Sequence, residues 1–579
     1  MKRISLLIAI LFATFGLNQM SAQIADLKNA YKGVVKIITY KADGTILRDG
    51  TGVFLNKEGD CAASFDLFKG ATAADVIDFK GNKRKAWRIL GAEGYKYNLV
   101  KFSTTTEGKK NETEFFAIAQ APKVGDTALL LHYTTNKKDK PTTASVTQSD
   151  EFDEGRYMHT TVANEDHNFG CPILDANGAL VGFVQQNVEK KDTTSCAIDA
   201  NFLNKLHISS MSVLNSDLRQ ILIPKALPSE EKEALTYLAM MNATDSVAAA
   251  TSYNDFITAY PENAEGYVAR AKFYAAKQDF ARCDADFENA LKQAGSEKST
   301  MKADEVHNEL SKVIFQKAIY SPKVEYKDWT LTKALKEAEA AYALNNQGFY
   351  LLQQGRCLFA DKQYKLAYEK FFQLASQSAP NDGNEWSGKA KADNWFYAAR
   401  SLELAGGDSL QVIALIDSAI SQCQKPYDQA AAQFFLERGQ RYHRINELRK
   451  AVNDYNVYEN TVGPANLGAE FYYLREQAEL GSRMYQQALD DIQSAILRTP
   501  NDLGLQIEQA IVLLRAGLYK QCVEYCQKLL QMHNDLADIY KIKGIAHGEL
   551  KQKQQAVACL TKAKELGDDT ADSYIQKYK

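Results

Sequence analysis

Proline and glycine are scarce in this chain, and neither sign of charge is in large excess. The 579 residues include 11 prolines and 33 glycines, so long helices can run without interruption. The 69 Lys and Arg against 72 Asp and Glu give a net charge of −3, which does not favour nucleic-acid binding by bulk charge. A hydrophobic content of 45% excludes a wholly disordered chain. We therefore expect a folded protein of several domains.

Long apolar runs are missing after the N-terminus. The run Ile4–Leu17 follows two basic residues and precedes the small residues Ser21 and Ala22. It is short of the roughly 20 apolar residues of a membrane span and is typical of a secretory signal peptide. We expect residues 1–22 to be removed and the mature chain, without a transmembrane segment, to reach the periplasm or cell envelope, or to be secreted. An uncleaved anchor helix is the alternative.

The cysteines do not show the spacing of a metal site, and no histidine pairs stand beside them. We predict that most are small core residues, and we expect neither a metal nor a cofactor. A Cys171–Cys196 disulfide is the alternative for that pair. The nine cysteines are Cys61, Cys171, Cys196, Cys283, Cys357, Cys423, Cys522, Cys526 and Cys559.

The chain changes character near two prolines, Pro224 and Pro228. Residues 24–210 contain short apolar runs, such as Gly33–Tyr40, between Gly-, Asn- and Asp-rich turns. This spacing predicts a β-sandwich or barrel. Residues 229–579 are Ala-rich and helical in pattern, and residues 211–228 are expected to be a linker.

Self-similarity with a period of 34 residues marks the helical part. Ala488, Cys522 and Ala556 are spaced by 34 residues, and so are Ala510 and Gly544. Such a period predicts pairs of antiparallel helices in which small residues let the axes approach. The expected packing residues are Ala271, Cys283, Ala290, Gly355, Ala367, Gly439, Ala451, Ala488, Ala495, Ala510, Cys522, Gly544, Ala556 and Ala563.

This pattern resembles the tetratricopeptide repeat (TPR) family over residues 229–579, with eight or nine repeats expected. The resemblance implies an all-α superhelix with a groove that binds a protein or peptide partner. Helix A of each repeat would supply the groove side chains, among them Tyr267, Arg270, Lys541 and Lys543.

The β-rich part resembles the trypsin-like serine proteases. The segments Gly50–Gly59 and Ala62–Ala71 are similar to the strands that lead to the catalytic His of that family. Gly94–Phe102 is similar to the strand of the catalytic Asp, and His167–Leu174 to the nucleophile loop. The strand Ser195–Asp199 follows in the expected order. The resemblance implies a double β-barrel.

The residues needed for catalysis are absent from these segments. In the aligned frame Asp66 replaces the His, Asn98 replaces the Asp and Phe169 replaces the Ser, while His167 stands at an oxyanion-hole glycine. No histidine occurs between residues 24 and 131, and no serine between 150 and 194. Sliding the alignment therefore does not restore the base or the nucleophile. We interpret the domain as a pseudoprotease, with Phe169 as either a plug of the former cleft or an exposed anchor for a peptide.

The leading hypothesis is a non-catalytic, exported interaction scaffold. One alternative is a divergent serine- or cysteine-type endopeptidase that uses Cys171 with His167, four residues apart. Another is a regulator of a protease in the cell envelope.

Overall fold

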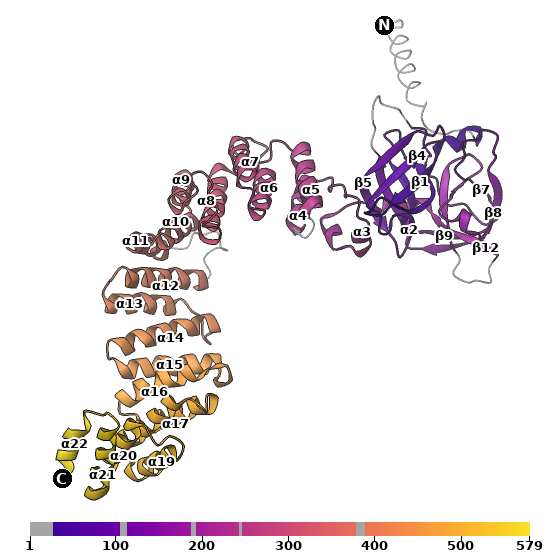
Figure 1. Cartoon of the computed structure of the whole chain (residues 1–579). Coiled ribbons are helices and arrows are strands. Elements are labelled where there is room, and N and C mark those ends of the chain that lie inside the picture. The colour runs from indigo at the N-terminus through magenta and orange to yellow at the C-terminus, as the bar shows by residue number, and fades with distance from the viewer. Residues whose placement is uncertain (1–26, 105–112, 187–192, 242–245, 378–387) are drawn as a thin grey trace. The chain divides into compact units, whose positions relative to one another are not determined.

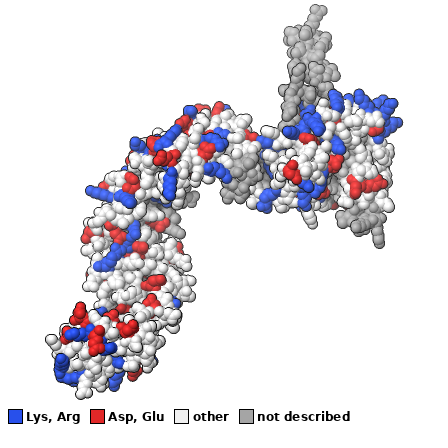
Figure 2. Space-filling view, in the orientation of Figure 1, with Lys and Arg blue, Asp and Glu red and all other residues white. Residues whose placement is uncertain are grey.

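The computed structural model describes residues 27–104, 113–186, 193–241, 246–377 and 388–579 (Figure 1). The expected signal peptide, residues 1–22, lies outside the described residues. The chain divides into two compact units, Met1–Val306 and His307–Lys579. In the described ranges, no helix is long and apolar enough to cross a membrane. Acidic and basic side chains are intermingled on the visible face (Figure 2).

The first unit begins with antiparallel strands. They are β1 (Val34–Tyr40), β2 (Ile46–Phe54), β3 (Cys61–Ser64), β4 (Ala73–Ile77), β5 (Lys83–Glu93), β6 (Leu99–Thr104), β7 (Thr127–Leu130), β8 (Thr142–Phe152), β9 (Gly155–Ala163), β10 (Pro172–Leu174), β11 (Leu180–Gln185) and β12 (Thr194–Asp199).

These strands close into two six-stranded barrels. Hydrogen-bonded neighbours follow the order β1-β2-β3-β6-β5-β4 in the first barrel and β10-β11-β12-β9-β8-β7 in the second. Counted from its own first strand, the second order is the first one read backwards, so the barrels share one topology. This confirms the double β-barrel that the sequence predicts for its N-terminal part.

Alternation along the strands separates the barrel interiors from the interface between the barrels. In β1, Val35 and Ile37 belong to the core of the first barrel, whereas Val34 faces the second barrel. There Val34 packs in one cluster with Leu180 and Phe183 of β11. A successive pair of apolar residues thus serves two cores, because side chains of a strand point to opposite faces.

Residues 211–228, expected to be a linker, pack against the first barrel instead. Leu218, Ile221 and Ile223 are at most 3% exposed and belong to its core cluster. The Ile89 amide of β5 donates to the Pro224 carbonyl at 2.9 Å, which fixes the backbone of the segment on the barrel. The short helices of this stretch are η4 (Ser210–Leu214) and α3 (Ser216–Gln220).

The first helices of the array are attached to the same barrel. Tyr237, on α4 (Glu231–Met240), is buried in the cluster of the first barrel. Arg88 of β5 forms a bidentate ion pair with Asp255 of α5 (Ser246–Ala259), with distances of 2.8 and 3.0 Å. The Arg88 side chain is only 8% exposed and stacks on Trp87 at 3.9 Å. Barrel and first helices therefore belong to one packed unit.

The other helices complete both units. In the barrel part they are η1 (Leu27–Gly33), α2 (Phe65–Phe68), η2 (Asp166–Asn168) and η3 (Ala200–Asn204). In the array they are α6 (Ala264–Ala276), α7 (Phe280–Gln293), α8 (Ala303–Tyr320), α9 (Leu331–Leu344), α10 (Gly348–Ala360), α11 (Tyr364–Ser376), α12 (Gly388–Leu404), α13 (Ser409–Ser421), α14 (Gln429–Arg444), α15 (Leu448–Val462), η5 (Pro464–Asn466), α16 (Ala469–Gly481), α17 (Tyr485–Arg498), α18 (Leu503–Arg515), α19 (Tyr519–Met532), α20 (Ala537–Glu549), α21 (Lys553–Glu565) and α22 (Ala571–Tyr578).

Six helical hairpins share one connection. Three residues separate α6 from α7, α10 from α11, α14 from α15, α16 from α17, α18 from α19, and α20 from α21. The helices α16, α18 and α20 begin at residues 469, 503 and 537, which are 34 apart. The middle residue of every one of these loops has a positive φ; these residues are Gln278, Lys362, Asn446, Arg483, Gly517 and Lys551.

The two helices of a hairpin meet in a constant register of 16 residues. A Cβ added to Gly355 would lie 2.5 Å from the Phe371 ring, and one added to Gly439 would lie 2.8 Å from the Tyr455 ring. The arithmetic is the same in both cases: 371 − 355 = 16 and 455 − 439 = 16. All fourteen residues expected to pack helix on helix are buried, and at the glycines only a hydrogen atom fits.

Candidate functional site

The structure places Asp66 and Asn98 side by side at the rim of the first barrel. The Asn98 side-chain amide donates to the Asp66 carboxylate at 3.0 Å. Its oxygen accepts the backbone N–H of Asp66 at 3.1 Å and the Ser64 hydroxyl at 3.2 Å. Asn98 itself has a φ of 50°, in the left-handed region that asparagine tolerates better than most residues. The cluster is a closed set of hydrogen bonds without an imidazole.

The second barrel contributes Gln185, at the end of β11, to this cluster. The Asn98 amide also donates to its Oε1 at 3.3 Å, and its Nε2 donates to the Tyr97 carbonyl at 3.3 Å. Sequence reasoning missed Gln185 because the residue lies 87 positions from Asn98. Only the packing of one barrel on the other brings the two amides together.

The loop that resembles the nucleophile loop uses its own amide donors. The Phe169 N–H donates to the Asp166 carbonyl at 3.3 Å, and the Gly170 N–H donates to the Val184 carbonyl at 2.9 Å. Gly170 has a φ of 73°, and a Cβ there would lie 3.2 Å from Ser64 Cβ. The loop therefore lies directly against the rim cluster. An oxyanion hole needs backbone donors that are free to point at the substrate, and the Phe169 donor is already engaged.

Phe169 and His167 point in different directions. The Phe169 ring is half-buried and packs against the core cluster of the second barrel. The His167 side chain is 65% exposed, lies 3.4 Å from the Glu165 carboxylate and stacks on His132 with ring centroids 5.4 Å apart. Packing of the aromatic ring on the core is the arrangement that a plug requires.

Cys171 is buried and has no imidazole as its hydrogen-bond acceptor. Its thiol donates to the backbone carbonyl of His167 at 3.5 Å rather than to the ring. Burial raises the pKa of this thiol to about 11, despite an opposing hydrogen bond with Thr51. The thiolate, which is the reactive form of cysteine, is thus disfavoured. Cys196 is also a free thiol, so the alternative of a Cys171–Cys196 disulfide is wrong.

The charged groove candidates of the helical part are paired within the chain. Arg270 forms a bidentate ion pair with Asp286 at 2.7 and 2.8 Å. Lys541 lies 2.6 Å from the Asp568 carboxylate. These two cations stabilise neighbouring helices and are not free for a partner. The remaining candidates also have contacts: Lys543 donates to Gln527, and the Tyr267 hydroxyl donates to the Pro261 carbonyl at 3.2 Å.

An ion pair with a spacing of 16 residues recurs along the array. It joins Arg270 to Asp286, Arg438 to Asp454 and Arg475 to Asp491, in each case from the first helix of a hairpin to the second. Each pair is bidentate, a geometry that fixes both direction and distance. The recurrence of arginine and aspartate at this interval is the sequence signal from which these pairs could have been found.

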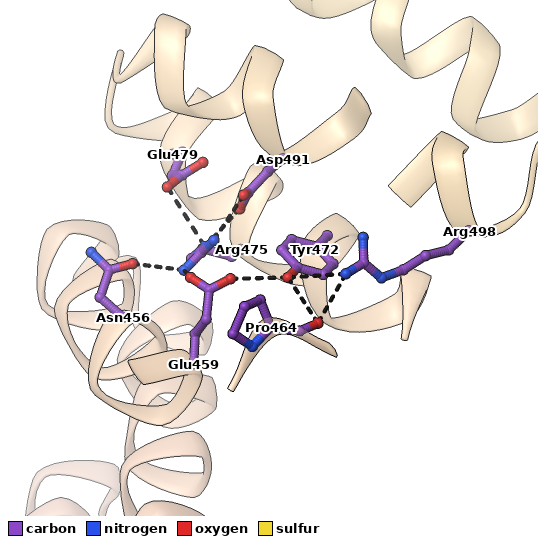
Figure 3. A network of polar contacts seen from close by, with 8 residues as sticks. All are labelled: Asn456, Glu459, Pro464, Tyr472, Arg475, Glu479, Asp491 and Arg498. Carbon is purple, nitrogen blue, oxygen red and sulfur yellow. Dashed lines mark hydrogen bonds and ion pairs between the residues drawn. The ribbon is translucent and has the colours of Figure 1, made fainter. Parts of the chain in front are cut away.

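The Arg475 network is the most extensive of the three (Figure 3). Besides Asp491, the guanidinium donates to Glu459 at 2.6 Å and to Asn456 at 2.8 Å, and the Glu479 carboxylate lies 3.8 Å away. Next to it, the Tyr472 hydroxyl donates to Glu459 at 2.9 Å. The network ties α15, α16 and α17 together.

Carboxylates outnumber cations in this part of the array. Burial is the largest cause that raises the pKa of Glu476 to about 8, and the nearby Glu508 charge adds to it. Burial and the Asp491 charge also raise the pKa of Glu479 well above its usual value. A metal would relieve such a charge excess, but among the described residues no group of three or more His, Cys, Asp or Glu is arranged to hold one.

Comparison with known proteins gives a distant structural likeness. No family model matches the chain, and no curated protein matches it. Among solved structures, the serine endoprotease from Yersinia pestis matches with 16% identity and a TM-score of 0.26. The match covers 34% of this chain and 68% of that one. A TM-score this low assigns neither a family nor an activity.

Proposed function

We propose that the chain is an exported, non-catalytic scaffold that binds proteins or peptides, with a degenerate trypsin-like domain followed by a TPR array. The observation that carries the proposal is the state of the former catalytic positions. Asp66 and Asn98 hydrogen-bond to each other at 3.0 Å, and Phe169 offers no nucleophile. Acyl transfer by this fold needs a hydroxyl, an imidazole and a carboxylate in line, and none of the three roles is filled.

The TPR part of the proposal is supported by the period of the helices and by their register. Helix starts 34 residues apart and a constant loop length are typical of that repeat. Stacked helix pairs of this kind form extended surfaces that bind peptides or helices. Export to the periplasm or cell envelope rests on the N-terminal sequence pattern of residues 1–22 alone.

A divergent cysteine peptidase is the alternative. The chain proximity of Cys171 and His167 favours it, since the thiol lies 3.5 Å from the His167 carbonyl. Against it stand the burial of the thiol, its raised pKa and the engagement of the imidazole with Glu165. A buried thiol that ionises near pH 11 is a poor nucleophile at neutral pH.

The test treats the folded full chain with a fluorophosphonate probe, a thiol-reactive probe and fluorogenic casein. We expect neither active-site labelling nor turnover above background, with Cys171→Ser equal to wild type. Cys196→Ser serves as the matched control in the same barrel. Labelling or turnover that Cys171→Ser abolishes and Cys196→Ser retains would establish the peptidase instead.

Binding is tested by affinity capture from cell-envelope extract with the full chain as bait, followed by crosslinking and mass spectrometry. We expect enriched proteins whose crosslinks map to the helical array. Enrichment no greater than on bare resin contradicts the scaffold. Crosslinks confined to the rim around Phe169 would place recognition in the barrel domain instead.

A further inference from the structure

A small pocket opens between the beginnings of α16 and α18 in the second unit. Its volume is about 320 Å³, and Glu470, Tyr473, Asp502 and Leu505 are among its lining residues. Ligand pockets range from about 300 to 1,000 Å³. This pocket is thus large enough for one extended side chain and too small for a folded element.

The charge of the pocket has one sign. Glu470 and Asp502 are both exposed, and the lining, all of it within the described ranges, contains no lysine or arginine. Asp502 caps α18 with one carboxylate oxygen, which accepts from Gly504 N at 2.9 Å and Leu505 N at 3.3 Å. Neither carboxylate forms an ion pair with another described residue. An anionic group would be repelled here, whereas a cation would find two carboxylates.

The negative character extends along α16 beyond the pocket. Glu470, Tyr473 and Gln477 are spaced by three and four residues, so they share one face of the helix. The Gln477 amide donates to Glu476 at 2.7 Å and to Glu508 of α18 at 3.0 Å. Glu476 is fully buried, and its Oε1 has no hydrogen-bond partner among the described residues. The nearby Arg515 offsets this charge only in part.

An aromatic ring lies beside these carboxylates. Tyr473 is 40% exposed and lines the pocket. Burial and the charges of Glu508 and Glu476 raise the pKa of its hydroxyl. A cation over the face of a tyrosine ring is attracted by the ring quadrupole, and adjacent carboxylates strengthen the attraction through charge-assisted hydrogen bonds.

We infer that this pocket binds a lysine or arginine side chain of a partner peptide, with Glu470 and Asp502 as the anionic acceptors and Tyr473 as the ring beneath the cation. The inference rests on the proposed scaffold function and specifies the chemistry of its partner. Charge complementarity favours a cationic peptide, because two exposed carboxylates and an exposed ring converge on a cavity of side-chain size.

The test measures fluorescence polarisation of a labelled peptide of alternating alanine and lysine with the full chain. Matched peptides replace lysine by glutamate or by uncharged norleucine. We expect the lysine peptide alone to bind. The double variant E470Q/D502N should weaken binding about fivefold for each carboxylate removed. Asparagine keeps the helix cap at position 502, so this variant should fold as wild type, which circular dichroism checks.

The control is D490N/E524Q, which removes two exposed carboxylates from α17 and α19, outside the pocket lining. It changes the net charge equally and should bind as wild type. Equal weakening by both double variants would show non-specific attraction and overturn the inference. Equal binding of the norleucine peptide, or no binding of the lysine peptide, would overturn it too. The scaffold proposal would survive each of these results if affinity capture still yields a partner whose binding E470Q/D502N leaves intact.

Discussion

Glu476 stands where the following repeats have a small residue. It is 34 residues before Ala510 and 68 before Gly544. Its side chain is fully buried next to Glu508, and both burial and that charge raise its pKa to about 8. At neutral pH the folded chain therefore holds a proton that the unfolded chain, with an ordinary glutamate pKa of 4.5, does not.

This raised pKa makes stability depend on pH. Because the folded-state pKa lies above the unfolded value, the contribution of the proton is fully present below about pH 4.5 and is lost as pH rises through about 8. We expect the urea midpoint of helix unfolding in wild type to fall between pH 5 and pH 8, on the order of 2 kcal/mol in free energy. The variant Glu476→Gln should show a shallower fall. Identical pH profiles of wild type and variant would contradict the assignment.

The pseudoprotease rim illustrates what a sequence can and cannot reveal about single residues. The positions of Asp66 and Asn98 were predictable, because each follows or begins a strand with a recognisable pattern. The contribution of Gln185 was not, since nothing near it in the chain indicates a partner in the other barrel. The occupied Phe169 amide was also not predictable, because backbone hydrogen bonds in an irregular loop depend on its final conformation.

The three-residue loops are the most uniform elements of the array. Five of the six middle residues are not glycine, although their φ values lie between 59° and 63°. A non-glycine residue in this left-handed region costs roughly 1–2 kcal/mol. The 34-residue columns of small residues predicted the helices correctly, since close helix packing leaves a strong mark in the sequence. The loops left no such mark, because lysine, glutamine and arginine occupy a position where glycine is the usual residue.

We expect Lys551→Gly to stabilise the array by about 1 kcal/mol, because glycine adopts a positive φ without steric cost. The control is Gln554→Gly in the first turn of α21, which should destabilise it by roughly 0.5–1 kcal/mol. Urea midpoints of both variants measured against wild type decide the matter. A loss of stability in Lys551→Gly would mean that the Lys551 side chain contributes more than its backbone costs.

At the scale of the whole molecule, the boundary between β-rich and helical sequence is not a boundary in packing. The prolines at 224 and 228 indicated a linker, yet the intervening backbone pairs with β5. The apolar residues Leu218, Ile221 and Ile223 gave the contrary signal, and they are buried in the first barrel. Their value could not be judged from sequence, because a short apolar cluster in a polar stretch has no period.

A fragment that ends at residue 210 should therefore be much less stable than one that ends at residue 306. The shorter fragment loses three buried aliphatic side chains, each worth about 1.5–3 kcal/mol, and the Arg88–Asp255 ion pair. Thermal unfolding followed by near-ultraviolet circular dichroism compares residues 24–210 with residues 24–306. Equal melting temperatures would mean that the segment after residue 210 lies on the barrel without stabilising it.

The repeated three-residue connection has a consequence for how the array changes over generations. Because α16, α18 and α20 begin at equal intervals and turn in the same way, a stretch of 34 residues can be duplicated or lost with both cut ends meeting in the original geometry. Unequal recombination between such stretches alters the reach of the array in whole steps. The surface offered to partners can thus lengthen or shorten while each remaining hairpin keeps its own internal contacts.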